Sequence, residues 1–162
     1  MFNLQSTYET LEGAQNLDPY EELQLLEHTI VLARDQGGCR YLQQRVIEAD
    51  DPKVFKIIFE GAISHFPELM GDPFGNYLTQ KLMEKASPAE LTRVIKVSQP
   101  FLVQLCKEMH GTRSIQKLID CAQTESNRML IAAELEPHIR FLSREINGNH
   151  VLVRILQTWK EK

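Results

Sequence analysis

The sequence lacks the features that mark several common classes of protein. No apolar stretch approaches the length of about 18 residues that a membrane-spanning helix needs, and the N-terminus has no basic segment followed by an apolar run. The three cysteines, Cys39, Cys106 and Cys121, form no Cys-x-x-Cys pair and are not accompanied by histidines at zinc-finger spacing. We therefore expect an intracellular protein with no disulfide framework, no bound metal and no cofactor.

An excess of basic residues is also absent. The net charge is −4, which argues at first against nucleic acid, because phosphate binding usually leaves a basic footprint. The acidity is concentrated at the start of the chain, where residues 1–28 hold six acids and no Lys or Arg, and the remainder is left with a charge of +2. A locally basic face in the remainder is therefore compatible with the composition.

What the sequence does contain is a repeat. Glycines at Gly38, Gly75, Gly111 and Gly148 follow one another at spacings of 37, 36 and 37 residues. Six residues before each glycine stands a leucine, and three before it an acid; the leucines are Leu32, Leu69, Leu105 and Leu142, and the acids are Asp35, Asp72, Glu108 and Glu145. A period of this size predicts an array of supersecondary units that stack on one another.

Each unit contains signals for two main helices and a short one. Helix starts are predicted where a capping oxygen precedes a proline, at Asp18-Pro19, Asp51-Pro52 and Ser87-Pro88, and Thr124 to Ser126 offers caps in the fourth unit. Prolines Pro67, Pro100 and Pro137 mark a break before a short helix. The second long helix then begins near the glycine. The apolar positions predicted for the first helices are Leu23, Leu26 and Ile30, Val54, Ile57, Ile58 and Ile63, Leu91, Val94 and Ile95, and Leu130 and Leu135.

The second helix has two distinct faces. Positions four and eight after the glycine, here called the seam positions, carry Leu42 and Val46, Thr79 and Met83, Ile115 and Ile119, and Leu152 and Leu156. Residues four apart share a helix face, so these predict the core-facing side. A unit of this size cannot close its own core, and the sequence therefore predicts an all-α fold in which the units stack as a solenoid.

The second face is made of positions one, two and five after the glycine, here called the reading positions. Positions one and five hold Cys39 and Gln43, Asn76 and Gln80, Thr112 and Gln116, and Asn149 and Val153, while position two holds Arg40, Tyr77, Arg113 and His150. Polar groups flanked by planar side chains suit single-stranded RNA, whose bases can stack and present their edges. A solvated polar face or a protein-binding face would show the same pattern.

These residues carry a resemblance to a known family. The four segments Gly38 to Gln43, Asp72 to Gln80, Met109 to Gln116 and Asn147 to Val153 resemble, in this order, the first four repeats of a Pumilio-homology (PUF) RNA-binding domain. The resemblance implies a right-handed α-solenoid of about four three-helix repeats, forming part of a crescent whose concave face is lined by the second helices.

The resemblance also implies a recognition code, with one repeat reading one RNA base. In that family Cys-Arg-x-x-Gln and Thr-Arg-x-x-Gln favour adenine, and Asn-Tyr-x-x-Gln and Asn-His-x-x-Gln favour uracil. The RNA runs antiparallel to the protein, so the predicted core is 5′-UAUA-3′ across the fourth, third, second and first repeats. Positions one and five would contact base edges, and Arg40, Tyr77, Arg113 and His150 would stack on bases. Lys81, Lys117 and Arg154, six after their glycines, are candidates for phosphate contacts or, equally, solvated charges.

Two departures from the family pattern stand out. Val153 replaces the glutamine, and we expect a weakened uracil preference in the fourth repeat. The chain also holds four repeats where a full domain of the family has eight. We expect a flexible acidic leader over residues 1–17 and repeats at approximately 18–50, 51–86, 87–123 and 124–162, forming half of a larger domain, and an apolar edge at Leu152, Ile155, Leu156 and Trp159 that promotes self-association.

No catalytic constellation accompanies the repeats. No glycine-rich phosphate loop and no nucleophile in a recognisable setting occurs, so we expect no enzyme activity. The resemblance implies messenger RNA, bound in its 3′ untranslated region, as the partner. It implies post-transcriptional regulation in the cytoplasm and leaves the convex face for protein partners. The alternative is a protein-binding helical scaffold or a divergent PUF-like ribosome-assembly factor located in the nucleolus.

Overall fold

A computed structural model describes residues 19–48 and 52–159 of the chain, and the regular structure of these residues is entirely helical. The elements in chain order are α2 (Pro19–Ala33), α3 (Gln36–Glu48), α4 (Pro52–Ile63), α5 (Phe66–Gly71), α6 (Gly75–Lys85), α7 (Pro88–Ser98), the 3-10 helix η1 (Gln99–Phe101), α8 (Leu102–Leu105), α9 (Met109–Cys121), α10 (Glu125–Leu135), the 3-10 helix η2 (Glu136–His138), α11 (Ile139–Leu142) and α12 (Ile146–Thr158). No helix of the described residues is both long and apolar enough to cross a membrane.

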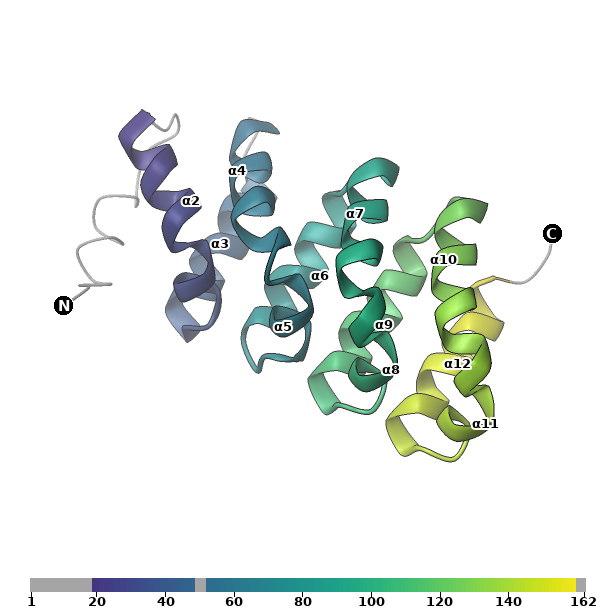
Figure 1. The fold of residues 1–162 in the computed structure, drawn as a ribbon. Coiled ribbons are helices and arrows are strands. Elements are labelled where there is room, and N and C mark those ends of the chain that lie inside the picture. The colour runs from purple at the N-terminus through teal and green to yellow at the C-terminus, as the bar shows by residue number, and fades with distance from the viewer. Residues whose placement is uncertain (1–18, 49–51, 160–162) are drawn as a thin grey trace.

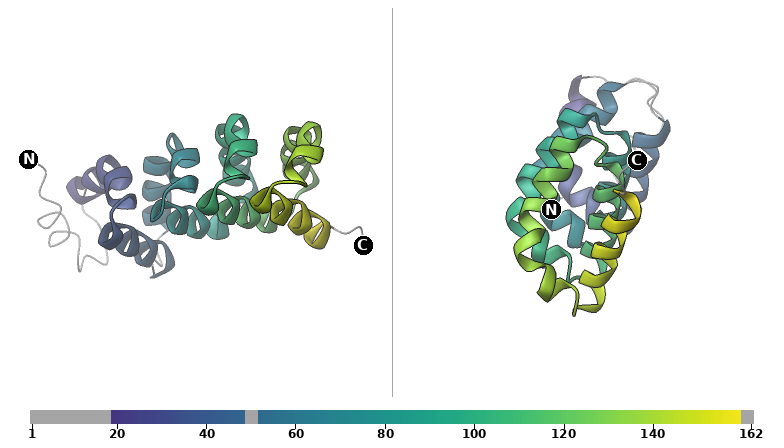
Figure 2. Two further views of the ribbon diagram at one scale, coloured as in Figure 1. Left: turned by 90° about the horizontal axis from the view of Figure 1, so that it is seen from below. Right: turned by 90° about the vertical axis from the view of Figure 1, so that its right-hand side faces the viewer.

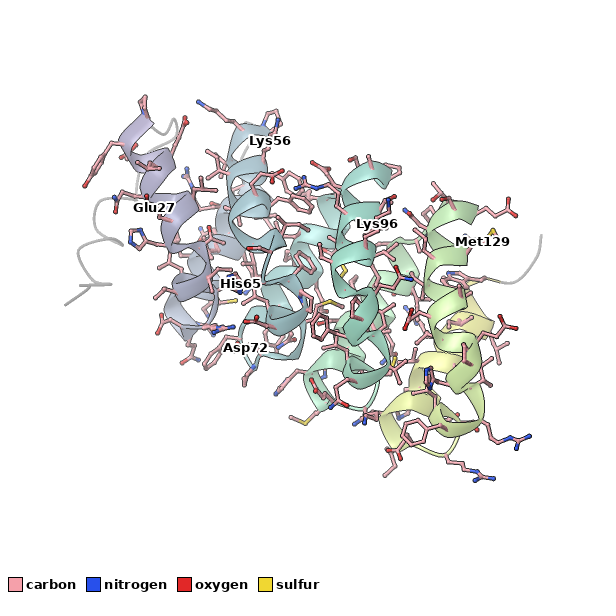
Figure 3. All side chains as sticks on the ribbon, in the orientation of Figure 1. Glu27, Lys56, His65, Asp72, Lys96 and Met129 are labelled. Carbon is pink, nitrogen blue, oxygen red and sulfur yellow. The ribbon has the colours of Figure 1, made fainter. Side chains whose placement is uncertain are left out.

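The helices form a two-layered solenoid. The first helices of the repeats, α2, α4, α7 and α10, lie side by side in one layer, and the second helices α3, α6, α9 and α12 form the other (Figure 1; Figure 2, left). The short helices α5, α8 and α11 connect the layers at one edge. Exposed polar side chains such as Glu27, Lys56 and Lys96 project from the first-helix layer (Figure 3). The predicted α-solenoid is therefore confirmed.

The glycine column marks the place where each second helix crosses its own short helix. A Cβ on Gly111 would lie 2.5 Å from the backbone oxygen of Leu105, and one on Gly148 would lie 2.8 Å from that of Leu142. Real Cβ atoms do not approach backbone this closely, so any larger residue would push the two helices apart. The shared leucine six residues earlier is the other half of this contact, and all four leucines of that column are buried.

The helix boundaries follow the predicted caps where those residues are described. Ser87 forms a capping box with Glu90 at the start of α7, and the Thr124 side chain accepts a hydrogen bond from the backbone N–H of Asn127 at the start of α10. The prolines at the breaks lie in the first turn of α5 and in η1 and η2. The caps predicted at Asp18 and Asp51, and the leader over residues 1–17, lie outside the described residues.

The acid column has two roles. Asp72 Oδ1 accepts hydrogen bonds from the backbone N–H groups of Phe74 and Gly75 at 2.8 and 2.7 Å, and Asp35 does the same for Gly38 at 2.8 Å. Glu108 and Glu145 occupy the N-cap positions of α9 and α12 but make no such side-chain cap. The shorter aspartate side chain folds back onto nearby backbone amides, which explains why the turns differ between the two halves of the chain.

The core runs the length of the stack, and the predicted seam positions are buried in the first three repeats. The first helix is a partial exception to the prediction. Leu23 and Leu26 are 49% and 40% exposed, and the buried residues of α2 are Leu25, Thr29, Leu32 and Ala33. Gly61 of α4 crosses α2 at Thr29, and a Cβ added to Gly61 would lie 2.7 Å from Thr29 Oγ1. A small polar residue therefore occupies the contact where a leucine was expected.

The first repeat also differs from the predicted three-helix unit. Helix α2 continues to Ala33 and α3 begins at Gln36, so that no separate short helix lies between them. The other three repeats contain all three helices, with η1 and η2 preceding the short helix in the third and fourth.

Candidate nucleic-acid interface

The reading positions lie on the second-helix layer, and the planar side chains at position two are its most exposed members. Arg40, Arg113 and His150 are exposed, and Tyr77 is 47% exposed. They belong to α3, α6, α9 and α12, which lie next to one another in the stack. The four planar groups are therefore presented to solvent from successive second helices, as stacking on splayed bases requires.

Position one is buried in the first three repeats, and in the first and third the next repeat covers it. Cys39 donates from its Sγ to the backbone oxygen of Phe74 at 3.0 Å, and Thr112 donates from its Oγ1 to that of Asn147 at 3.1 Å. In both cases the acceptor is the residue directly before the following glycine. These two reading positions are therefore completed by the repeat that comes after them.

Asn76 is held by its own repeat instead. Its Nδ2 donates to the backbone oxygens of Asp72 and Pro73 at 2.7 and 3.0 Å, and its Oδ1 accepts from Gln80 Nε2 at 3.2 Å. The side chain is buried. These bonds fix the amide orientation without a ligand, so the Asn76–Gln80 pair is preorganised.

The glutamines at position five share one arrangement. Gln43 Nε2 donates to the backbone oxygen of Cys39 at 3.2 Å, Gln80 donates to Asn76, and Gln116 donates to the backbone oxygen of Thr112 at 3.3 Å. Each side chain is only half-buried. Since the amide nitrogen is turned back towards the helix in all three, the carbonyl oxygen is the end left to accept a hydrogen bond from a base.

A cleft of about 410 Å³ lies between the first two repeats at these positions. Its lining contains the reading residues Cys39, Arg40, Gln43 and Tyr77. The cleft therefore has planar groups from two successive repeats and an amide that can bond to a base edge, which is the arrangement that binding of one splayed base requires.

The structure adds residues that the sequence reasoning missed. Gln36, Pro73 and Phe74 also line the cleft. Gln36 and Pro73 stand two residues before their glycines, one helical turn before the reading positions, so the same periodicity that found those positions could have found this one. Asn147, whose Nδ2 donates to the backbone oxygen of Lys107 at 2.7 Å, was missed because its role depends on a contact between repeats.

The fourth repeat presents a different surface. Asn149 is exposed, unlike its three counterparts, and Val153 is 40% exposed where the other repeats have glutamine. Ile146, one turn before them, is 82% exposed. The reading positions of α12 are therefore all in place, but they are more apolar than the others and are not covered by a following helix within the described residues.

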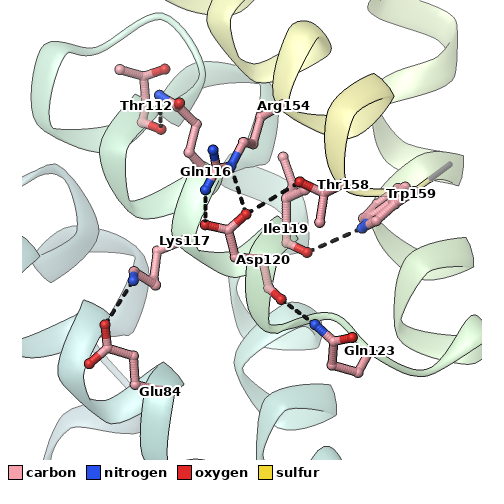
Figure 4. Close-up of polar contacts among 10 residues, drawn as sticks. All are labelled: Glu84, Thr112, Gln116, Lys117, Ile119, Asp120, Gln123, Arg154, Thr158 and Trp159. Atoms are coloured by element: carbon pink, nitrogen blue, oxygen red, sulfur yellow. Dashed lines mark hydrogen bonds and ion pairs between the residues drawn. The ribbon is translucent and has the colours of Figure 1, made fainter.

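The three cations predicted as phosphate contacts all take part in ion pairs. Lys81 and Lys117 both pair with Glu84, and Arg154 pairs with Asp120 (Figure 4). Two of these pairs connect neighbouring second helices. The charges are thus not simply solvated, and any phosphate would meet them in company with a carboxylate.

The cysteines have no catalytic or metal-binding setting. Burial raises the pKa of all three thiols, to about 12 for Cys106, so they are protonated at neutral pH. All three are free, and the part of the chain that the structure describes contains no group of three or more potential metal ligands.

Comparison with known proteins agrees with this geometry. The family model described as the Pumilio-family RNA binding repeat matches residues 28–60, 65–97 and 102–135. Pumilio homolog 12 of Arabidopsis thaliana is 40% identical over 129 residues, which cover 78% of this chain and 22% of that protein.

Solved structures give the same result. The Puf4 RNA binding domain bound to the HO endonuclease RNA 3′ UTR recognition sequence has a TM-score of 0.75 and 41% identity, over 80% of this chain and 40% of that one. The RNA-binding domain of yeast Puf5p bound to AAT2 RNA has a TM-score of 0.78 and 30% identity, over 94% of this chain and 41% of that one.

The chain thus spans about a fifth of the length of the curated relative and about two fifths of the solved domains. The matched segments cover more than half of the chain and contain the reading positions of the first three repeats. On this evidence the chain belongs to the Pumilio family of RNA-binding repeat proteins.

Proposed function

We propose that this chain binds single-stranded RNA sequence-specifically through the reading positions of α3, α6, α9 and α12, with one base for each repeat. The observation that carries the proposal is the cleft between the first two repeats, where Arg40 and Tyr77 flank the half-buried amide of Gln43. Family membership supports the same activity, and it confirms the prediction that the chain is not an enzyme.

The proposed core sequence is 5′-UAUA-3′. The first and third repeats, with Cys39 and Gln43 and with Thr112 and Gln116, would take adenine, and the second, with Asn76 and Gln80, would take uracil. The fourth repeat would take the 5′ uracil with less discrimination, because Val153 offers no hydrogen bond to the base edge. His150 would still supply a stacking contact of about 1–3 kcal/mol.

The biological role that we propose is post-transcriptional regulation of messenger RNA in the cytoplasm. It is supported by the solved relatives, whose bound RNAs include 3′ UTR recognition sequences. We further propose that this chain acts as half of a larger repeat domain. Leu156, 70% exposed, occupies a seam position that the next repeat covers elsewhere in the stack, which supports this arrangement.

The direct test is binding of a labelled RNA that contains 5′-UAUA-3′, measured by fluorescence anisotropy at stated salt concentrations. We expect tighter binding than to a scrambled strand of the same composition. Equal binding of the two strands would remove the sequence specificity from the proposal.

A second experiment separates RNA binding from a protein-scaffold function. Replacing Arg40, Tyr77 and Arg113 together by alanine removes three exposed planar groups, none of which belongs to the buried core. We expect the triple variant to keep its helical content and to lose most RNA binding. If binding were unchanged, the scaffold function would be the better explanation of the solenoid.

A further inference from the structure

Two carboxylates lie among the cations that face the RNA in the proposed function. Glu84 Oε2 accepts a hydrogen bond from Lys81 Nζ at 2.9 Å, and its Oε1 accepts one from Lys117 Nζ at 2.7 Å. Asp120 accepts two from Arg154, at 2.7 Å from Nε and 2.6 Å from Nη2 (Figure 4). Each acid thus engages a cation of the next second helix.

The pairs follow the repeat. Glu84 and Asp120 stand nine residues after Gly75 and Gly111, and their partners Lys117 and Arg154 stand six residues after the next glycine. Position six is four residues after the stacking position, so these cations lie on the same stripe as Tyr77, Arg113 and His150, one turn further along the helix. A cation there is placed to approach the backbone of an RNA whose bases stack on position two.

The electrostatics favour the paired state at neutral pH. The hydrogen bond from Lys117 lowers the pKa of the Glu84 carboxyl, and the same bond raises the pKa of Lys117. The hydrogen bonds to Asp120 raise the pKa of Arg154. Both partners are therefore charged, and each carboxylate acts as a fixed counterion for cations that a phosphate would otherwise neutralise.

We propose that Glu84 and Asp120 restrain the affinity of this face for RNA by holding Lys81, Lys117 and Arg154 in ion pairs. The proposal rests on the proposed RNA-binding function. A phosphate that takes one of these cations must displace a carboxylate, which then remains nearby and repels it. Less counterion is released than free cations would release, so both the affinity and its salt dependence are reduced.

The junction between the first two repeats lacks this arrangement. The residue nine after Gly38 is Ile47, which is 51% exposed, and Lys81 turns instead to Glu84 on its own helix. The restraint thus belongs to the second-to-third and third-to-fourth junctions. Replacing Glu84 should release two lysines at once, and replacing Asp120 should release one arginine.

The chain offers a matched control on its other layer. Glu60 of α4 pairs with Arg93 of α7 through two hydrogen bonds of 2.6 and 2.9 Å, also between neighbouring repeats. Glu60→Gln removes one negative charge and one ion pair between repeats, as Glu84→Gln does, but it lies on the first-helix layer, away from the reading positions. Any effect of net charge or of lost stability appears in both variants.

The experiment measures binding of the 5′-UAUA-containing RNA by anisotropy over a series of salt concentrations. For Glu84→Gln we expect affinity about threefold to tenfold higher at low salt, and a log affinity against log salt slope steeper by about 0.7 for each phosphate gained. Asp120→Asn should show a smaller gain, and Glu60→Gln none. Adding Lys81→Gln and Lys117→Gln to Glu84→Gln should abolish the gain.

The outcomes separate this proposal from the one on which it rests. If the unaltered chain binds the RNA specifically and Glu84→Gln binds equally or more weakly, with the same slope, the carboxylates serve only to hold the repeats together and the restraint does not exist. A gain that Glu60→Gln shares, or one that survives loss of both lysines, would also overturn it. An unaltered chain that does not bind the RNA overturns the proposed function itself.

Discussion

The third and fourth repeats carry the same sequence pattern but bury it differently. Ile115 and Ile119, at the seam positions of α9, are fully buried, whereas their counterparts in α12 are a half-buried Leu152 and a Leu156 that is 70% exposed. Trp159 covers the end of α9 by donating from Nε1 to the backbone oxygen of Ile119 at 3.1 Å. The difference shows that a repeat determines which face is apolar, while its neighbour supplies the burial.

The same contrast extends to the reading positions. Thr112 is 6% exposed and is held by Asn147 of the next repeat, whereas Asn149 is exposed. The base-reading group of the third repeat is therefore built from two repeats. The third repeat is complete in this respect, and the fourth supplies only its own half.

The largest expected effect comes from truncating the two seams. Ile119→Ala should reduce the free energy of unfolding by about 2–4 kcal/mol, because it leaves a cavity between α9 and its neighbours. Leu156→Ala should change it by less than about 0.5 kcal/mol, because the side chain is already in solvent. Urea denaturation followed by circular dichroism measures both. Equal losses would mean that Leu156 is covered in solution, and sedimentation analysis would then show self-association.

The glycine column should respond alike in the two repeats, since its close contact lies within one repeat. Gly111→Ala and Gly148→Ala should each cost about 1–3 kcal/mol, because the new Cβ meets the backbone of Leu105 or Leu142. Gly71→Ala is the control: its Cβ would come closest to Glu108 Oε2, the end of a flexible side chain, so little change is expected. Thermal denaturation that ranked Gly111→Ala with Gly71→Ala would contradict the packing explanation.

The reading positions offer an exchange between the same two repeats. Gln116→Val gives the third repeat the pattern of the fourth and should reduce discrimination at its base by about 1 kcal/mol, the net value of one hydrogen bond. Val153→Gln should increase discrimination at the fourth base by a similar amount. Competition binding with RNAs altered at one base measures both changes. Discrimination that does not move in opposite directions would show that position five does not contact the base edge.

Acid should weaken the junctions between repeats by a small amount. The hydrogen bonds from Arg93 and from Lys117 lower the pKa values of Glu60 and Glu84 below their ordinary value of 4.5. Their contribution is therefore complete above that value and is lost as the pH falls through the lower pKa of the folded state. We expect less than about 1 kcal/mol for each exposed pair. Glu60→Gln should flatten the acid side of the stability profile, and an unchanged profile would argue against this pair.

Much of the fold could be predicted from the sequence because its signals are repeated. The leucine and glycine columns recur four times, and Ser87 and Thr124 cap their helices as their residue types indicate. Contacts between repeats could not be predicted in the same way. Thr29 is buried, and its hydroxyl is satisfied by the backbone oxygen of Leu25 at 2.7 Å, so hydropathy favoured Leu26 in its place.

The candidate site was predictable to a similar degree. Positions one, two and five could be found because they repeat, and the planar groups at position two are exposed as expected. The pairing of Lys117 with Glu84, and the bond from Thr112 to Asn147, join residues 33 and 35 positions apart and depend on the angle between helices. No pattern within a single repeat contains that angle.

The measurement that tests the central claim most directly is a switch of one base. Asn76→Ser with Gln80→Glu replaces the preorganised amide pair of the second repeat by a hydroxyl and a carboxylate, which accepts hydrogen bonds from the donors of guanine. Anisotropy with the two strands 5′-UAUA-3′ and 5′-UAGA-3′ should show that the unaltered chain prefers the first and the double variant the second. A double variant that folds, binds RNA and keeps its preference for uracil would contradict the assignment of these positions as the ones that read the base.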